Sequence, residues 1–237
     1  MQEFGKLYLI PTRLGDNPPL EVLPISIKKI IESVDHYIVE NEKTARRFIK
    51  KVSSNKPQSK LKLGVLNKHT LPEELPDLLA PCKAGFNVGI LSEAGCPAIA
   101  DPGSDIVKLA HEDRIKVIPL VGPSSIVLAL MGSGMNGQSF TFNGYIPIDK
   151  HERKTTLKRL ERLSFEHNQT QLLIETPYRN NKLLEDMVNS LHPQTRICVA
   201  CDLTLPTEYI LTQTAKDWKN TKEDFHKRPA IFLIHRD

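Results

Sequence analysis

Residues 90–103 read Ile-Leu-Ser-Glu-Ala-Gly-Cys-Pro-Ala-Ile-Ala-Asp-Pro-Gly, and the rest of the chain is organised around this stretch. The apolar run Val88–Leu91 predicts a buried strand that ends in small residues, and Asp101–Gly103 has the composition of a turn. Ser104 is placed to cap a helix over Asp105–His111. Ligands of open α/β sheets bind beyond the carboxyl ends of the strands, so the small residues predict a ligand against the backbone. An ordinary strand–turn–helix joint that binds nothing is the alternative.

The composition is that of a globular protein with a mildly basic surface. The 237 residues are 40% hydrophobic and 25% charged, with a net charge of +4, and this length allows one large domain or two of about 120 residues. The charge is compatible with an anionic partner. No apolar run approaches the roughly 18 residues of a membrane span, and the first residues lack the layout of a signal peptide. We therefore expect a cytoplasmic protein with no membrane partner.

The first half of the chain alternates strands with helices. Apolar runs predict strands at Leu7–Ile10, Tyr37–Val39, Lys62–Leu66, Phe86–Leu91 and Lys116–Leu120. Helices are expected between them, among them a basic one over Thr44–Val52. This alternation is typical of a parallel sheet with right-handed crossovers, whose polar strand ends gather at one edge. We assign residues 1–120 to an N-terminal α/β domain.

The second half, residues 121–237, has more consecutive strands. They are expected at Phe140–Tyr145, Gln171–Ile174, Arg196–Asp202, Thr207–Leu211 and Pro229–His235. Thr212 is expected to cap a short helical segment over Ala215–Lys219. Consecutive strands favour antiparallel pairing, so we expect a mixed sheet in a C-terminal α/β domain. The charged segment Asp149–Leu163 is better explained as a solvated helix than as a nucleic-acid patch.

The familiar catalytic motifs are absent from the sequence. It has no phosphate-binding loop, dinucleotide fingerprint, nucleophile elbow or metalloprotease motif. Cys198 and Cys201 have metal spacing, but on a strand such residues point to opposite faces, so buried thiols are favoured over a zinc or redox site. We expect no metal. Small-residue loops and a few carboxylates remain, which suit the binding of a polar cofactor.

Taken together and in order, the motifs resemble the tetrapyrrole (corrin and porphyrin) methylase superfamily. They are most similar to its branch that methylates a cytidine ribose 2′-hydroxyl in small-subunit ribosomal RNA. The resemblance runs from Gly5 to Leu205. Its matching segments are Gly5–Asn17, Val39–Lys43, Ser92–Gly103, Val121–Ser125, Gly144–Pro147, Ile174–Arg179 and Ala200–Leu205.

The resemblance implies two α/β/α domains with a cofactor cleft between them, S-adenosyl-L-methionine as the cofactor, a homodimer, and ribosomal RNA or the small ribosomal subunit as partner. Carried over by position, the residues expected to bind the cofactor are Pro11, Ser92, Glu93, Ala94, Gly95, Ile99, Ser124, Ser125, Thr176 and backbone near Leu203. A ribose hydroxyl needs a base at neutral pH. The candidates for this catalytic role are Glu40, Lys43, and Glu175 with Arg179, and salt bridging is the alternative for each.

The sequence departs from the branch at the expected substrate side. The branch reads Glu-Asp-Thr-Arg where this chain has Glu40, Asn41, Glu42 and Lys43. Tyr178 stands where the branch has histidine. Three interpretations therefore compete: an RNA 2′-O-methyltransferase, a methyltransferase for a tetrapyrrole or other small molecule, and a non-catalytic relative that keeps the fold.

Overall fold

The computed structural model describes residues 3–237, and the chain divides between Ser124 and Ser125 into two compact units. The division expected from the sequence lay after residue 120, in the same segment between strand and helix. No helix within residues 3–237 is long and apolar enough to cross a membrane.

The first unit is built on a five-stranded sheet in the order β3-β2-β4-β1-β5, and every pair in it is parallel. Its strands are β1 (Leu7–Ile10), β2 (His36–Val39), β3 (Lys62–Val65), β4 (Val88–Leu91) and β5 (Val117–Pro119). The helices are α1 (Pro19–Val22), α2 (Ile25–Ser33), α3 (Glu42–Val52), α4 (Leu75–Lys83) and α5 (Gly103–Glu112), with 3-10 turns η1 (Gln58–Lys60) and η2 (Pro72–Glu74). The expected parallel sheet is confirmed.

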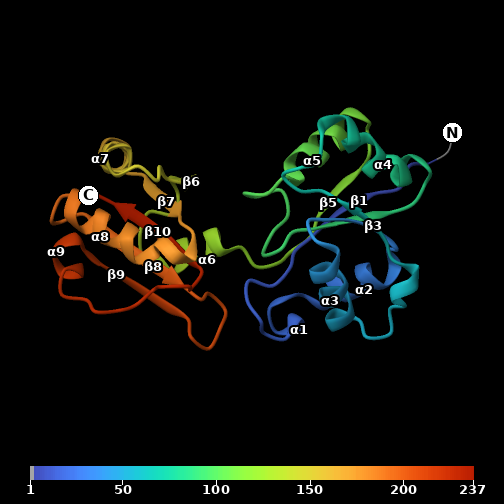
Figure 1. The fold of residues 1–237 in the computed structure, drawn as a ribbon, viewed down its shortest axis with the longest axis horizontal. Coiled ribbons are helices and arrows are strands. Elements are labelled where there is room, and N and C mark those ends of the chain that lie inside the picture. Colours follow the sequence, from blue (N-terminus) through green and yellow to red (C-terminus); the bar gives the residue numbers. More distant parts are fainter. Residues whose placement is uncertain (1–2) are drawn as a thin grey trace. The chain divides into compact units, whose positions relative to one another are not determined.

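Helices cover both faces of this sheet, as Figure 1 shows. One apolar core joins the sheet to α2 and α3 through residues such as Ile27, Ile31 and Ile49. The other joins the opposite face to α4 and α5 through Leu79 and Ile106. Burial on both faces explains why β4 has no polar side chain, since each of its residues is enclosed.

The second unit contains a five-stranded mixed sheet in the order β6-β7-β10-β8-β9. Only the β6–β7 pair is parallel, while β7–β10, β10–β8 and β8–β9 are antiparallel. Its strands are β6 (Phe140–Tyr145), β7 (Thr170–Ile174), β8 (Arg196–Cys201), β9 (Tyr209–Thr214) and β10 (Ala230–His235). Its helices are α6 (Ser125–Ser133), α7 (Lys150–His167), α8 (Asn180–Ser190) and α9 (Ala215–Trp218), with the 3-10 turn η3 (Pro177–Arg179). The expected mixed sheet is therefore confirmed.

Two expected caps are wrong. Helix α5 begins at Gly103, so Ser104 lies inside its first turn. The side chain of Asp101 accepts from the backbone N–H groups of Ala98 and Gly103 at 2.8 Å each and fixes this start instead. Thr214, at the end of β9, caps α9 by accepting from the N–H of Asp217. The hydroxyl of Thr212 donates to the carbonyl of Ser133.

Candidate functional site at the carboxyl edge of the first sheet

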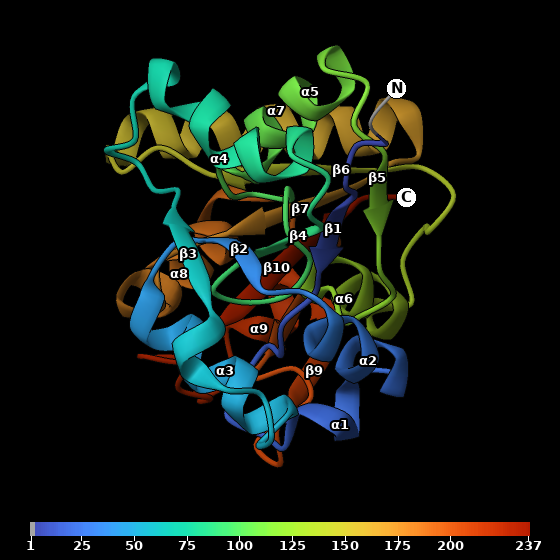
Figure 2. The ribbon, with the colours of Figure 1, turned by 90° about the vertical axis from the view of Figure 1, so that its right-hand side faces the viewer.

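Three strands of the first sheet end side by side. Ile10 and Val39 both pair with Leu91 in register. The residues that follow these strand ends therefore meet at one edge, which Figure 2 shows from the side of the first unit. A parallel sheet brings these polar and small residues together, although they are far apart in sequence.

The loop after β4 is held to the loop after β1. The backbone N–H of Thr12 donates to the carbonyl of Gly95 at 2.9 Å, and the hydroxyl of Ser92 donates to the same carbonyl at 3.1 Å. Gly95 has a φ of +77°, a conformation that favours glycine. A Cβ there would lie 3.2 Å from Leu14 Cδ2. The structure thus brings together Pro11 and the predicted Ser92–Gly95 loop.

Ile99 lies further along, at an exposed turn. It is 52% exposed, and its neighbours Ala98 and Ala100 both have left-handed backbone conformations, with φ of 66° and 62°. Asp101 holds this turn through the two backbone hydrogen bonds described above. Burial raises the pKa of Asp101, and the hydrogen bonds from Gly103 and Ala98 oppose that shift.

Glu40 follows β2 and contacts the loop after β4. Its Oε1 accepts from the backbone N–H of Glu93 at 3.0 Å. The Glu93 carboxylate in turn accepts from the hydroxyl of Thr44 at 2.6 Å, so the ends of β2 and β4 and the start of α3 are linked. Burial raises the pKa of Glu40, the hydrogen bond from Glu93 lowers it, and the charges of Asp101 and Glu93 raise it further.

Because the pKa of Glu40 is raised, the free energy of unfolding should depend on pH through this residue. A carboxyl with a higher pKa in the folded state binds its proton more tightly there, so its stabilising contribution is complete below the unfolded value of 4.5. That contribution is lost as pH rises through the folded pKa. Glu40→Gln removes it, so we expect the variant to gain free energy of unfolding relative to wild type as pH rises, measured by denaturant titration at several pH values. A difference that stays constant with pH would contradict this.

Asn41 caps the helix that carries the next polar residues. Its side chain accepts from the backbone N–H groups of Lys43 at 2.9 Å and Thr44 at 3.2 Å. Helix α3 therefore starts at Glu42, two residues before the expected start. Lys43 is exposed on its first turn.

Replacing the Asn41 cap tests this account. Asn41→Ala should lower the free energy of unfolding by about 1 kcal/mol, because two helix N–H groups lose their acceptor. Asn41→Asp keeps the acceptor and adds a negative charge at the helix N-terminus, so it should be at least as stable as wild type. Chemical denaturation of the three proteins measures both effects. Equal losses in the two variants would show that the amide nitrogen, rather than the acceptor oxygen, matters.

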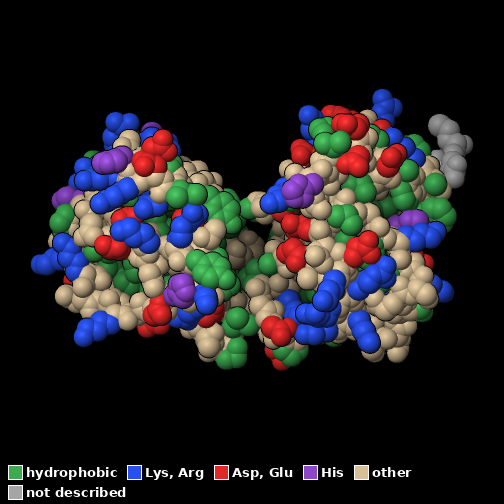
Figure 3. Space-filling model, in the orientation of Figure 1, with side chains coloured by type: hydrophobic (Ala, Val, Ile, Leu, Met, Phe, Trp, Pro, Cys, Tyr) green, Lys and Arg blue, Asp and Glu red, His purple; other side chains and the backbone are tan. Residues whose placement is uncertain are grey.

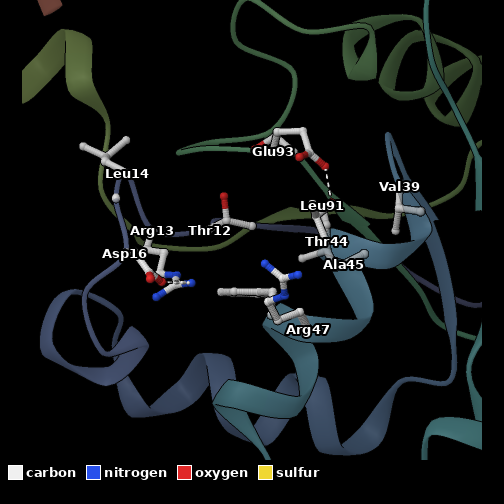
Figure 4. A pocket seen from close by; sticks show the side chains of 13 residues that line it. Thr12, Arg13, Leu14, Asp16, Val39, Thr44, Ala45, Arg47, Leu91 and Glu93 are labelled. Carbon is white, nitrogen blue, oxygen red and sulfur yellow. Dashed lines mark hydrogen bonds and ion pairs between the residues drawn. The ribbon is translucent and has the colours of Figure 1, made fainter. Parts of the chain in front are cut away.

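A pocket of about 210 Å³ opens at this edge. Its walls come from the loop after β1 (residues 12–16), Val39 at the end of β2, the first turns of α3, and residues 91–93 after β4. We call it the carboxyl-edge pocket, and Figure 4 shows the side chains that line it. Asp16, at its rim, is paired with Arg13 at 2.7 Å and Lys51 at 2.9 Å. The hydrogen bond from Lys51 and the charge of Arg13 lower the pKa of Asp16.

The second unit holds the other predicted residues. The buried carboxylate of Glu175 pairs with Arg179 at 2.6 Å and accepts from the backbone N–H of Thr176 at the same distance. Thr176 and Arg179 also line an open groove beside Tyr145 and Ile148. The ion pair joins residues four positions apart within the second unit and fixes the turn after β7.

The remaining expected cofactor residues take separate places. Ser124 ends the first unit, and Ser125 is the first residue of α6. Leu203 is buried between Asp202 and Thr204, which both have left-handed backbone conformations.

Of the residues that line the carboxyl-edge pocket, the sequence predicted only Ser92 and Glu93 as site residues, and Thr12, Thr44 and Arg47 are among those it missed. Thr12 directly follows Pro11, and a single threonine after a strand carries no local mark of a site. Asn41 precedes a helical pattern and caps α3, so it is the sequence signal that places Thr44 and Arg47 in the first turns of this helix.

Relatives of the chain are methyltransferases. A family model described as Tetrapyrrole (Corrin/Porphyrin) Methylases matches residues 6–218. The Ribosomal RNA small subunit methyltransferase I of Vibrio cholerae serotype O1 is 26% identical over 97% of this chain and 76% of its own length. The protein of the same name from Synechocystis is 30% identical over 84% of this chain and 67% of its own length.

Solved structures share the fold. A cobalt precorrin-4 methyltransferase of cobalamin biosynthesis has a TM-score of 0.62 at 18% identity, with 97% of this chain and 94% of that chain covered. Uroporphyrin-III-C-methyltransferase from Thermus thermophilus has a TM-score of 0.58 at 17% identity, with 98% and 94% covered. At these identities the likeness concerns the fold alone.

Proposed function

Because this chain belongs to the tetrapyrrole (corrin/porphyrin) methylase family and is a methyltransferase, we propose that it methylates a ribose 2′-hydroxyl in small-subunit ribosomal RNA, with S-adenosyl-L-methionine as donor. The observation that carries the substrate is that relatives named for small-subunit ribosomal RNA match sequence in both compact units. The proposed enzyme is a cytoplasmic homodimer, and sedimentation analysis tests its oligomeric state.

The residues of the first unit fit a cofactor of this kind. Glu93 and Ala94 in the loop after β4 are exposed, and a Cβ at Gly95 would make a tight contact of 3.2 Å with Leu14 Cδ2. We propose that Pro11 and the Ser92–Gly95 loop hold the cofactor, together with Ile99, Ser124, Ser125, Thr176 and the backbone near Leu203. When bound, S-adenosyl-L-methionine supplies a methyl group that is already activated on a sulfonium. The chain must then orient the acceptor and exclude water.

Within this proposal, Glu40 removes the proton from the ribose hydroxyl. Its Oε1 is held by the N–H of Glu93, so the second carboxylate oxygen can accept the proton. A base with a raised pKa is stronger than an ordinary carboxylate, which suits a weakly acidic hydroxyl. Lys43 is the alternative base. Glu175 is less suited, because its carboxylate is buried and paired with Arg179, and we propose that this pair positions the turn at Thr176.

The direct test is methyl transfer from labelled S-adenosyl-L-methionine to small ribosomal subunits that lack their methyl groups. Label in ribose 2′-O-methyl nucleotides, found by nuclease digestion and chromatography, would support the proposal. Label in a tetrapyrrole and none in RNA would favour the small-molecule alternative. Cofactor binding without transfer to either substrate would favour a non-catalytic relative.

A further inference from the structure

Helix α3 carries cations without acidic partners on the side that reaches the carboxyl-edge pocket. Lys43, Arg47 and Lys50 follow one another at a spacing of one helical turn, so they share a face. Within residues 3–237 none of the three makes an ion pair, whereas Arg46 is paired with Glu42. Figure 3 shows Lys and Arg side chains gathered over the part of the first unit that holds α3. Like charges one turn apart destabilise a helix slightly, so this row favours an external anion.

Arg47 is the member of this row that lines the pocket. In Figure 4 its side chain extends from α3 along the wall that faces Thr12. The other arginine of the pocket, Arg13, is already engaged, because it pairs with Asp16 at 2.7 Å. Asp16 is shared with Lys51, so the acidic group at the rim is neutralised without Arg47. The guanidinium of Arg47 is thus available for a ligand.

Thr12 provides a second, independent sign of a ligand. It is 4% exposed, and its hydroxyl oxygen is buried without a hydrogen-bond partner among the described residues. Buried polar groups are normally paired, so an unpaired one needs an explanation. Figure 4 shows this oxygen turned toward the space between Leu14 and Glu93. A ligand oxygen in the pocket would supply the missing partner.

We propose that Arg47 and Thr12 bind a backbone phosphate of the RNA beside the methylated nucleotide, which rests on the function proposed above. Arginine forms charge-assisted hydrogen bonds to phosphate oxygens, and a threonine hydroxyl can donate to the same group. The cofactor's own carboxylate could also use one cation. A single carboxylate cannot contact the whole row from Lys43 to Lys50, because the row extends over about 10 Å of helix. Successive phosphates of an RNA backbone can.

The experiment measures binding of small-subunit ribosomal RNA, transcribed in vitro, at several salt concentrations. For single strands, each phosphate contact contributes about 0.7 to the slope of log K against log salt. Arg47→Ala should therefore reduce the slope by about 0.7 and weaken binding roughly tenfold. Thr12→Val should weaken binding a few-fold without a change in slope, because no charge is lost, and Thr12→Ser should restore it. Cofactor affinity, measured by calorimetry, should stay unchanged in all three.

Arg159→Ala is the matched control, since it removes the same side chain from an exposed site on α7. A slope change in Arg47→Ala no larger than in this control would overturn the proposal. So would a loss of cofactor affinity with an unchanged RNA slope, because the pocket would then hold the cofactor.

Methyl transfer by the same proteins separates the two proposals. If wild type methylates the RNA while Arg47→Ala keeps the wild-type slope, the phosphate site fails and the proposed function stands. If wild type binds RNA through Arg47 without methylating it, the function fails and the phosphate site stands. If wild type does not bind RNA, both are overturned.

Discussion

Glu40→Gln should lower kcat for RNA methylation by a hundredfold or more, while the affinity for S-adenosyl-L-methionine stays the same. Glutamine has the same shape and can still accept the hydrogen bond from the N–H of Glu93, but it cannot take a proton. Loss of a general base costs about 10²–10⁴-fold in rate. The wild-type rate should also rise with pH through the raised pKa of Glu40, and this limb of the pH profile should be absent from the variant.

Glu42→Gln is the matched control for this prediction. Glu42 lies two residues further along and forms only an exposed pair with Arg46, at 3.6 Å. Exposed pairs of this kind contribute little, so kcat should stay within about twofold of wild type. A Glu40→Gln protein that keeps the wild-type kcat and pH profile would remove Glu40 from the mechanism and leave Lys43 as the candidate base.

The sequence predicts the layers of this fold well because strand and helix periods are local signals. Leu7–Ile10 is a strand as predicted, and the strand predicted at Phe86–Leu91 is observed over Val88–Leu91. The predictions that Ser104 and Thr212 are helix caps are wrong for a different reason. Several polar residues near each helix start can cap it, and which one does so depends on how the chain leaves the preceding strand. Asp101 prevails at α5 because its side chain reaches two backbone N–H groups across a turn.

The candidate site was only partly predictable. The Ser92–Gly95 loop stands out in the sequence because an apolar strand runs directly into small residues. Contacts across the strand ends leave no such local mark: Glu40 and the N–H of Glu93 are 53 positions apart. They meet only because β2 and β4 are neighbours in register. Arg47 is one of several basic residues in α3, and the sequence alone does not distinguish it from the others. In the structure it is the one that lines the pocket.

Gly5→Ala should be among the most damaging single substitutions in the first unit. An added Cβ would lie 1.8 Å from the carbonyl oxygen of Phe86 and 2.9 Å from the backbone nitrogen of Asn87. No side-chain rotation relieves a clash with backbone. The chain before β1 would have to move away from the chain before β4, and the backbone hydrogen bond from Gly5 to Cys82 would be strained. We expect a loss of about 3 kcal/mol or more in the free energy of unfolding.

Gly137→Ala separates this clash from the general effect of removing a glycine. A Cβ at Gly137 would meet no atom within 4 Å, so the substitution should change stability by less than about 0.5 kcal/mol. Denaturant unfolding of the two variants and wild type measures the difference. Because β1 and β4 carry the loops that form the candidate site, Gly5→Ala should also weaken cofactor binding even where it remains folded. Equal stability of the two variants would show that the backbone at Gly5 can shift to accommodate a Cβ. The close contact between the chain before β1 and the chain before β4 would then not be needed to hold this part of the sheet.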